Sequence, residues 1–343
     1  MNKGIFVEGL KKVYVTRKRQ GWFRSHKEEK VAIEHLNLMI PCGQVTGLLG
    51  LNGAGKTTTI KILSTLLLPT EGRVQVDELD LIQDAALVRR RVNMIVGGER
   101  MVYWRLTGRE NLWYFAQLYD VEPRRVHERI NELLRLVGLE EAADTLVEHY
   151  SKGMKQRLQI ARGLINDPAY LFLDEPTLGL DAPIAHELRQ RIKELATEEK
   201  KGILLTSHYL TEVEELCSYI YVIDQGRLVI QGSPDEIKAR TQIDRVIRIL
   251  LPELPDQVIS ALHSIKEQTG ARLEEQQTDE GMVITVRHPE DITGSVAAAI
   301  VLHGGSMLKL DVLEPKLEDA ILALTPNING NSTSEASQYA AKR

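Results

Sequence analysis

The 343-residue chain contains few cysteines, few aromatic residues and no long apolar run. Its two cysteines, Cys42 and Cys217, are far apart and form no CxxC motif, so the sequence predicts neither a disulfide framework nor a zinc site. Aromatic residues make up 5% of the chain, which indicates a mainly aliphatic core. No segment holds the ~20 apolar residues that cross a bilayer. Any role at a membrane therefore requires a partner.

The sequence also lacks an excess of basic residues. Forty-three Lys and Arg stand against 48 Asp and Glu, a net charge of −5 at pH 7. Nucleic-acid binders usually carry a basic surface, so we expect no nucleic-acid partner. Near the start, Glu8, Lys11 and Lys12 stand where a signal peptide needs apolar residues. These features predict a protein that is not exported.

The length predicts two domains at about 150 residues each. In residues 1–240, the short apolar runs 44–49, 169–173 and 202–206 each adjoin a helical stretch, which is typical of buried parallel strands in an α/β fold. A polar helical region at about 107–166, with a break at Glu122-Pro123, lies between the first two runs and predicts a helical insertion. A helix is expected at 57–68, and a hairpin at 218–231 closes the domain.

The remaining residues show a different order of predicted strands and helices. Residues 241–325 follow the order β-α-β-β-α-β, which is typical of a ferredoxin-like α+β domain, here expected to be an accessory domain. Residues 326–343 are polar and rich in Asn and Ser, so we predict a disordered tail.

The clearest chemical motif is the segment Gly-Leu-Asn-Gly-Ala-Gly-Lys-Thr at 50–57, which matches the G-x-x-x-x-G-K-[ST] phosphate loop between a strand and a helix. In such a loop, backbone N–H groups surround a triphosphate, Lys56 reaches the β and γ oxygens, and the Thr57 hydroxyl ligates Mg²⁺. The alternative is a glycine-rich turn followed by a surface lysine. The predicted nucleotide contacts are Gly50, Leu51, Asn52, Gly53, Ala54, Gly55, Lys56, Thr57 and Thr58.

Two carboxylates, Asp174 and Glu175, follow the apolar run 169–173. A phosphate loop needs a carboxylate on a neighbouring strand to hold Mg²⁺, and Asp174 has that position. Glu175 is placed to polarise an attacking water. Taken alone, the two acids fit the start of a solvated loop equally well.

With these motifs in order, residues 5–232 resemble the ATP-binding subunits of ABC transporters, especially the branch that exports drugs, antibiotics and polysaccharides. Residues 150–157 are similar to the signature segment, 171–175 to the Walker B strand and 178–181 to the D-loop. The resemblance implies a P-loop NTPase core with a parallel sheet, an inserted helical subdomain and an N-terminal antiparallel β region. It implies ATP and Mg²⁺ as cofactors, with Thr57 and Asp174 at the metal. It further implies catalytic roles for Glu175 and His208, and ATP contacts from Tyr14, Ser151, Lys152, Gly153 and Asp181.

The resemblance also implies partners. It places the phosphate loop and the signature on opposite edges of a subunit, so ATP is expected between two copies of the chain, which form a homodimer. Separately encoded membrane-spanning permease subunits would hold the protein at the cytoplasmic face of the cell membrane. The alternative is a soluble ABC-type ATPase that acts as a nucleotide-gated switch on a non-membrane partner.

The segment at residues 98–104 departs from the family pattern at one point and resembles it at another. The family's Q-loop glutamine is absent, and Glu99, or Gly98 in a shifted register, takes its place, which removes an amide donor. Tyr103 and Trp104 follow, similar to the segment that docks on permease coupling helices, with packing against neighbouring helices as the alternative.

Residues 11–30 hold eight Lys and Arg against two Glu, with Trp22 and Phe23 in the middle. This basic segment is predicted either to lie against anionic lipid or a partner, or to form a solvated hairpin extension.

Overall fold

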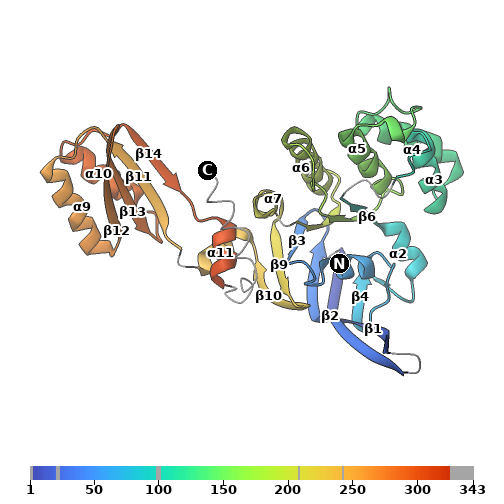
Figure 1. Ribbon diagram of the computed structural model, residues 1–343. Helices are drawn as coiled ribbons and strands as arrows, with labels where there is room; N and C mark the ends of the chain where they lie inside the picture. The colour runs from blue at the N-terminus through green and yellow to red at the C-terminus, as the bar shows by residue number, and fades with distance from the viewer. Residues whose placement is uncertain (1–2, 21–23, 98–101, 208, 242, 325–343) are drawn as a thin grey trace. The chain divides into compact units, whose positions relative to one another are not determined.

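A computed structural model describes residues 3–20, 24–97, 102–207, 209–241 and 243–324, with the backbone alone for 17–20 and 24–27 (Figure 1). The chain divides into two compact units, Met1–Pro234 and Asp235–Arg343. The sequence predicts this boundary after residue 240, so residues 235–240, which belong to the short helix α8 (Pro234–Arg240), fall in the second unit instead of the first. Among the described residues, no helix is long and apolar enough to cross a membrane.

The first unit is built on a six-stranded sheet in the order β10-β9-β3-β8-β7-β6. Its strands are β3 (Val45–Leu49), β6 (Val92–Val96), β7 (Tyr170–Asp174), β8 (Gly202–Thr206), β9 (Tyr219–Asp224) and β10 (Arg227–Gly232). All neighbours are parallel except β9 and β10, which form the predicted hairpin. Every residue of β3, β7 and β8 is buried, as expected for apolar strands covered on both faces. The predicted α/β class is confirmed.

A second, antiparallel sheet has the order β2-β1-β4-β5. Its strands are β1 (Gly4–Gln20), β2 (Arg24–Pro41), β4 (Glu71–Val76) and β5 (Leu79–Asp80). Apolar side chains from both sheets share one core, for example Ile5 and Leu38 with Phe172 and Leu204. This sheet is the antiparallel β region that the sequence predicted.

A polar network crosses between the two sheets at Tyr170. The Tyr170 hydroxyl donates to Asp77 Oδ1 at 2.5 Å and accepts from Cys42 Sγ at 3.2 Å. Asp77 also pairs with Arg91. Burial is the main cause of a raised Tyr170 pKa, so the phenol stays protonated and can donate.

Helices pack around the central sheet. They are α1 (Lys56–Leu63), α2 (Ala85–Arg91), α6 (Ala182–Thr197) and α7 (Leu210–Leu216). The predicted extension of the first helix to residue 68 is wrong: α1 ends at Leu63, and Thr65 adopts a left-handed conformation with φ 58°. That conformation does not continue a right-handed helix.

The helical insertion contains α3 (Gly108–Leu118), α4 (Pro123–Leu136), the 3₁₀ helix η1 (Val147–His149) and α5 (Lys152–Gly163). Thr107 and Glu110 form a capping box at the start of α3, and α4 begins at Pro123, where the sequence predicted a break. The insertion is joined to the sheet by Arg162 of α5. Its fully buried guanidinium donates to the Met94 carbonyl of β6 at 2.7 Å and lies 5.1 Å from the Phe115 ring of α3.

The second unit contains β11 (Arg245–Leu251), α9 (Asp256–Thr269), β12 (Arg272–Thr278), β13 (Gly281–His288), α10 (Thr293–Leu302) and β14 (Lys309–Leu313), followed by α11 (Leu317–Leu324). The sheet order β12-β13-β11-β14, antiparallel throughout, is the ferredoxin-like arrangement that the sequence predicted (Figure 1). Ile249 and Ile284 lie opposite each other in its core, with Val258 of α9 and Val296 of α10.

We predict that Tyr170→Phe lowers the free energy of unfolding by about 1–3 kcal/mol, because Asp77, a mostly buried carboxylate, loses a donor. Chemical denaturation of the full chain measures this loss. Tyr221→Phe is the matched control, since within the described residues that buried hydroxyl accepts one neutral bond, from the Met39 N–H, and its loss should cost less. An equal or smaller loss in Tyr170→Phe would contradict the role of this network.

Candidate active site

The phosphate loop follows β3 and opens α1 at the edge of the sheet where the parallel strands end. Gly50 and Gly55 are required there by close backbone contacts. A Cβ on Gly50 would lie 2.2 Å from the Ile223 carbonyl oxygen, and one on Gly55 would lie 2.6 Å from that of Ala32. Both residues also have positive φ, 155° and 111°, which side chains rarely adopt. The loop therefore has its tight course because of these two glycines.

Lys56 is enclosed by the loop. Its side chain is 7% exposed, and Nζ donates to the carbonyl oxygens of Gly50 at 2.5 Å and Leu51 at 3.3 Å. Burial lowers the pKa of Lys56, and the charges of Glu175 and Asp174 oppose that effect. An enclosed cation at a helix N-terminus is suited to bind phosphate oxygens.

Asp174, at the end of β7, is held at both carboxylate oxygens. Thr57 Oγ1 donates to Oδ2 at 3.1 Å, and Thr206 Oγ1 donates to Oδ1 at 2.6 Å. A hydroxyl and a carboxylate side by side are hard oxygen donors of the kind that Mg²⁺ prefers. Mg²⁺ is usually bound by one or two protein oxygens and takes its other ligands from phosphate and water, so this donor pair fits it. The described residues contain no cluster of three or more His, Cys, Asp or Glu suited to a metal.

Sequence reasoning did not find Thr206. It ends the apolar run 202–206, and only the strand register, which pairs Asp174 with Thr206, brings the two side chains together. The one signal for Thr206 in the sequence is its position as a polar residue at the end of an apolar run.

Glu175 has a left-handed backbone, with φ 52°. Its N–H donates to the Thr206 carbonyl at 2.9 Å, and the Gly97 N–H donates to the Asp174 carbonyl at 2.8 Å. A Cβ on Gly97 would lie 2.1 Å from the Glu175 carbonyl oxygen, so the end of β6 packs directly on this turn. Strained backbone of this kind is held in place by its surroundings and is concentrated at functional sites.

A cavity of about 220 Å³ lies beside these groups and is lined by Lys56, Thr57 and Glu175, but not by Asp174. Tyr14 of β1 lies on its wall, with the hydroxyl 3.4 Å from Thr58 Oγ1. The structure thus brings Tyr14, the loop and Glu175 to one hollow. Lys30 and Ala32 of β2 also line it and were not among the predicted site residues; Lys30 pairs with Tyr14 in the register of the two strands.

The signature residues lie elsewhere in the first unit. Ser151 caps α5 by accepting from the Met154 N–H at 3.2 Å, and Lys152 and Gly153 form the first turn. Asp181 precedes α6. None of these four residues lines the phosphate-loop cavity. A buried bond from Gln156 Nε2 to the Pro176 carbonyl, 2.8 Å, connects α5 to the segment after Glu175.

His208, Gly98 and Glu99 lie outside the described residues, as do Trp22 and Phe23. Tyr103 and Trp104 are described, and each is 49% exposed. The Tyr103 ring lies 4.9 Å from that of Tyr114, and Lys155 Nζ lies 4.8 Å from the centre of the Trp104 ring. These aromatics are therefore at the surface rather than in the core.

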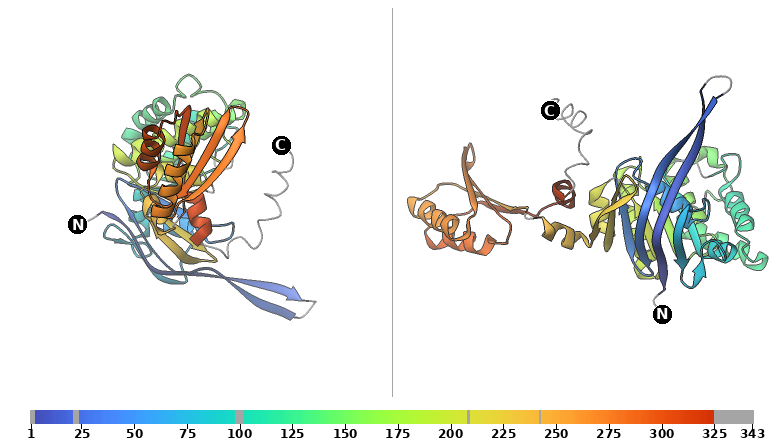
Figure 2. Two further views of the ribbon diagram at one scale, coloured as in Figure 1. Left: turned by 90° about the vertical axis from the view of Figure 1, so that its left-hand side faces the viewer. Right: turned by 90° about the horizontal axis from the view of Figure 1, so that it is seen from below.

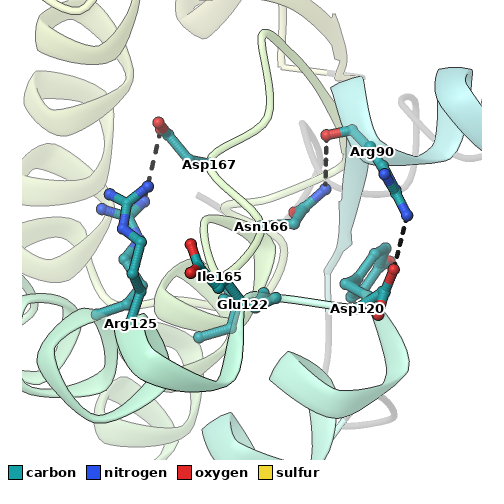
Figure 3. A pocket seen from close by; sticks show the side chains of 10 residues that line it. Arg90, Asp120, Glu122, Arg125, Ile165, Asn166 and Asp167 are labelled. Atoms are coloured by element: carbon teal, nitrogen blue, oxygen red, sulfur yellow. Dashed lines mark hydrogen bonds and ion pairs between the residues drawn. The ribbon is translucent and has the colours of Figure 1, made fainter.

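Another cavity, about 210 Å³, lies among α2, the α3–α4 connection and the loop after α5 (Figure 3). Three arginines on its wall are balanced by three acids; the wall includes Arg90, Arg125, Arg129, Asp120, Glu122 and Asp167. Arg90 is paired with Asp120 at 2.7 Å and Arg129 with Asp167 at 3.6 Å. The cavity contains none of the predicted nucleotide residues.

A phosphate loop around a buried lysine, with a strand-end carboxylate bonded to the loop threonine, defines a P-loop NTPase. The chain belongs to the ABC transporter ATP-binding family, and is an ABC-type ATPase that binds ATP. The family profile described as ABC transporter matches residues 33–178.

Relatives match over nearly the whole chain. Daunorubicin resistance ATP-binding protein DrrA2 of Streptomyces coeruleorubidus is 35% identical over 89% of this chain and 93% of its own length. Bacitracin transport ATP-binding protein BcrA of Bacillus licheniformis is 34% identical over 85% and 92%, respectively. A solved structure of the ATP binding subunit of an ABC transporter is 30% identical, with a TM-score of 0.57 over 69% of this chain and 92% of that one.

We predict that Thr206→Val lowers Mg²⁺-dependent ATP hydrolysis by about 10-fold or more and raises the Mg²⁺ concentration needed for half-maximal rate, because Asp174 loses one of its two donors. Titration of the ATPase rate with Mg²⁺ measures both quantities. Thr46→Val on neighbouring β3 is the control, since no bond to the Thr46 hydroxyl occurs within the described residues. Similar titrations for both variants would rule out a role for Thr206 at the site.

Proposed function

We propose that this chain is the ATP-hydrolysing subunit of an ABC exporter and that it powers transport by nucleotide-dependent dimerisation. The observation that supports the proposal is the arrangement of Lys56, Thr57, Asp174 and Glu175 at one sheet edge, beside a cavity that Tyr14 also lines. The relatives named for daunorubicin resistance and bacitracin transport support an exporter rather than a soluble switch.

Each residue then has a defined role. Loop N–H groups and Lys56 bind the phosphates, and Tyr14 stacks on the adenine. Thr57 and Asp174 would hold Mg²⁺, which when bound neutralises charge on the phosphate oxygens. Thr206 keeps the Asp174 carboxylate oriented toward Thr57. Glu175 accepts a proton from the attacking water, and His208 contacts the γ-phosphate.

The signature residues act on the nucleotide of a second copy. Ser151, Lys152 and Gly153 open the twelve-residue helix α5, whose N-terminus is suited to a phosphate, yet they do not line the chain's own cavity. A second copy would place them, with Asp181, over the γ-phosphate. We infer two equivalent sites in a homodimer.

The permease partner would dock on the exposed aromatic residues Tyr103, Trp104, Trp113 and Tyr114, since aromatic side chains beside cations are enriched at interface centres. Separately encoded permease subunits would hold the chain at the cytoplasmic face of the membrane. The second unit carries no phosphate-binding motif and would regulate the dimer rather than take part in hydrolysis.

Glu175→Gln should retain ATP binding and lose turnover by about 10²- to 10⁴-fold, because the amide cannot accept the proton of the attacking water. Lys56→Ala should instead weaken ATP binding itself, since a direct phosphate contact is removed. ATP affinity and steady-state hydrolysis of both variants are the measurements. Glu71→Gln, which loses only an exposed ion pair with Lys11, is the control and should behave as wild type. Near-normal hydrolysis by Glu175→Gln would remove Glu175 from this role.

With ATP, Glu175→Gln should sediment as a dimer, because the bound nucleotide joins two copies and is not hydrolysed; with ADP it should sediment as a monomer. Analytical ultracentrifugation distinguishes the two states. Adding Ser151→Asp to Glu175→Gln places a negative charge opposite the γ-phosphate and should abolish the ATP-dependent dimer while leaving ATP binding. An unchanged dimer in the double variant would refute the two-copy site.

A further inference from the structure

The β1–β2 hairpin continues well past the sheet to which it belongs. β4 pairs with β1 only from Ile5 to Lys11, whereas β1 and β2 remain paired as far as Gln20 and Arg24. β2 is the edge strand of its sheet. The far part of the hairpin is therefore a two-stranded ribbon, which Figure 2 shows as an arm projecting beyond the other strands of the first unit. We call residues 16–20 and 24–28 the basic arm.

The two strands of the basic arm, residues 16–20 and 24–28, have no apolar residue in their sequence and are strongly charged. It holds five Lys and Arg against one Glu, in a chain whose net charge is −5. The strand register places Arg17 directly opposite Lys27, a pair of like charges. At its base, Val15 and Val31 are 52% and 46% exposed, so the shared core of the two sheets ends before the arm begins.

The charge of the basic arm and the lack of a core beneath it do not stabilise the hairpin. Like charges directly opposite each other in a β-ladder are destabilising, and a two-stranded hairpin without a third strand or core is marginally stable in water. The basic residues therefore indicate an anionic partner outside the chain that would offset their mutual repulsion.

Charge complementarity favours lipid as that partner. Cytoplasmic loops of membrane proteins are enriched in Lys and Arg, so a permease would repel the arm. The cytoplasmic leaflet carries anionic headgroups and attracts clusters of Lys and Arg. We propose that the basic arm binds the anionic headgroups of the membrane surface directly. The inference rests on the proposed location at the membrane, and it requires neither hydrolysis nor a permease.

Such a contact would be close to the nucleotide cavity. Two register pairs, Val15 with Glu29 and Thr16 with Glu28, separate the arm's charged pairs from Tyr14 and Lys30, which line the cavity. Membrane contact would therefore orient the same strands that form one wall of the ATP site.

The test is flotation of the purified full chain, without permease, with vesicles of phosphatidylcholine alone or mixed with phosphatidylglycerol. We expect binding only to the mixed vesicles, and weaker binding as salt is raised. Arg17→Gln with Lys27→Gln should lower the partition coefficient about 25-fold, at roughly fivefold for each basic residue removed. The matched control is Arg73→Gln with Arg135→Gln, which removes the same charge from exposed positions outside the arm and should change binding less than twofold.

Several outcomes would overturn the proposal. Two concern the vesicles: both double variants bind them equally, or the chain binds the two kinds of vesicle equally. Two concern other anions: the chain binds duplex DNA more tightly than vesicles, or millimolar inorganic phosphate abolishes vesicle binding. ATP affinity of the arm variant should equal that of wild type. That measurement separates failure of this inference from failure of the proposed ATPase function, and unchanged denaturation shows that the variant is folded.

Discussion

The arrangement of the site depends on the hydrogen bonds to both oxygens of Asp174. One comes from Thr57, at the start of α1, and the other from Thr206, at the end of β8. β7 is fully buried and paired on both sides, so the backbone that carries this carboxylate is held by its neighbours in the sheet. The same bonds tie the phosphate loop and β8 to Asp174, the chain neighbour of Glu175. Polar groups held in fixed positions in this way are suited to stabilise charge that develops in a reaction.

The helical insertion is joined to this frame by buried polar contacts. Arg162 of α5 reaches the Met94 carbonyl on β6, and β6 leads to Gly97, whose N–H bonds to the Asp174 carbonyl. Burial lowers the pKa of Arg162, yet this guanidinium remains charged at neutral pH. Gln156 adds a second buried connection, to Pro176. Contacts of this kind connect the helical insertion to the sheet edge that carries Asp174 and Glu175.

The antiparallel sheet contributes to both the cavity wall and the basic arm. β1 and β2 supply Tyr14 and Lys30 to the wall of the phosphate-loop cavity, and they then continue into the basic arm. Two long strands thus connect the wall of this cavity to the basic arm. The hydrogen bonds of Tyr170 join this sheet to the parallel sheet, so a displacement of the antiparallel sheet would be transmitted to the first residue of β7.

Much of the fold was predictable because its signals are local. The phosphate loop, the acids after an apolar run, the break at Pro123 and the β-α-β-β-α-β order each depend on residues close together in the sequence.

The other features required the tertiary structure, because they depend on which strands become neighbours. The bond from Thr206 to Asp174 follows from the pairing of β7 with β8, and Lys30 reaches the cavity only through the register of β1 and β2. The burial of Arg162 and the left-handed turn at Glu175 are likewise absent from any local pattern, since both depend on contacts with residues distant in the chain, Met94 for Arg162 and Gly97 and Thr206 for the turn.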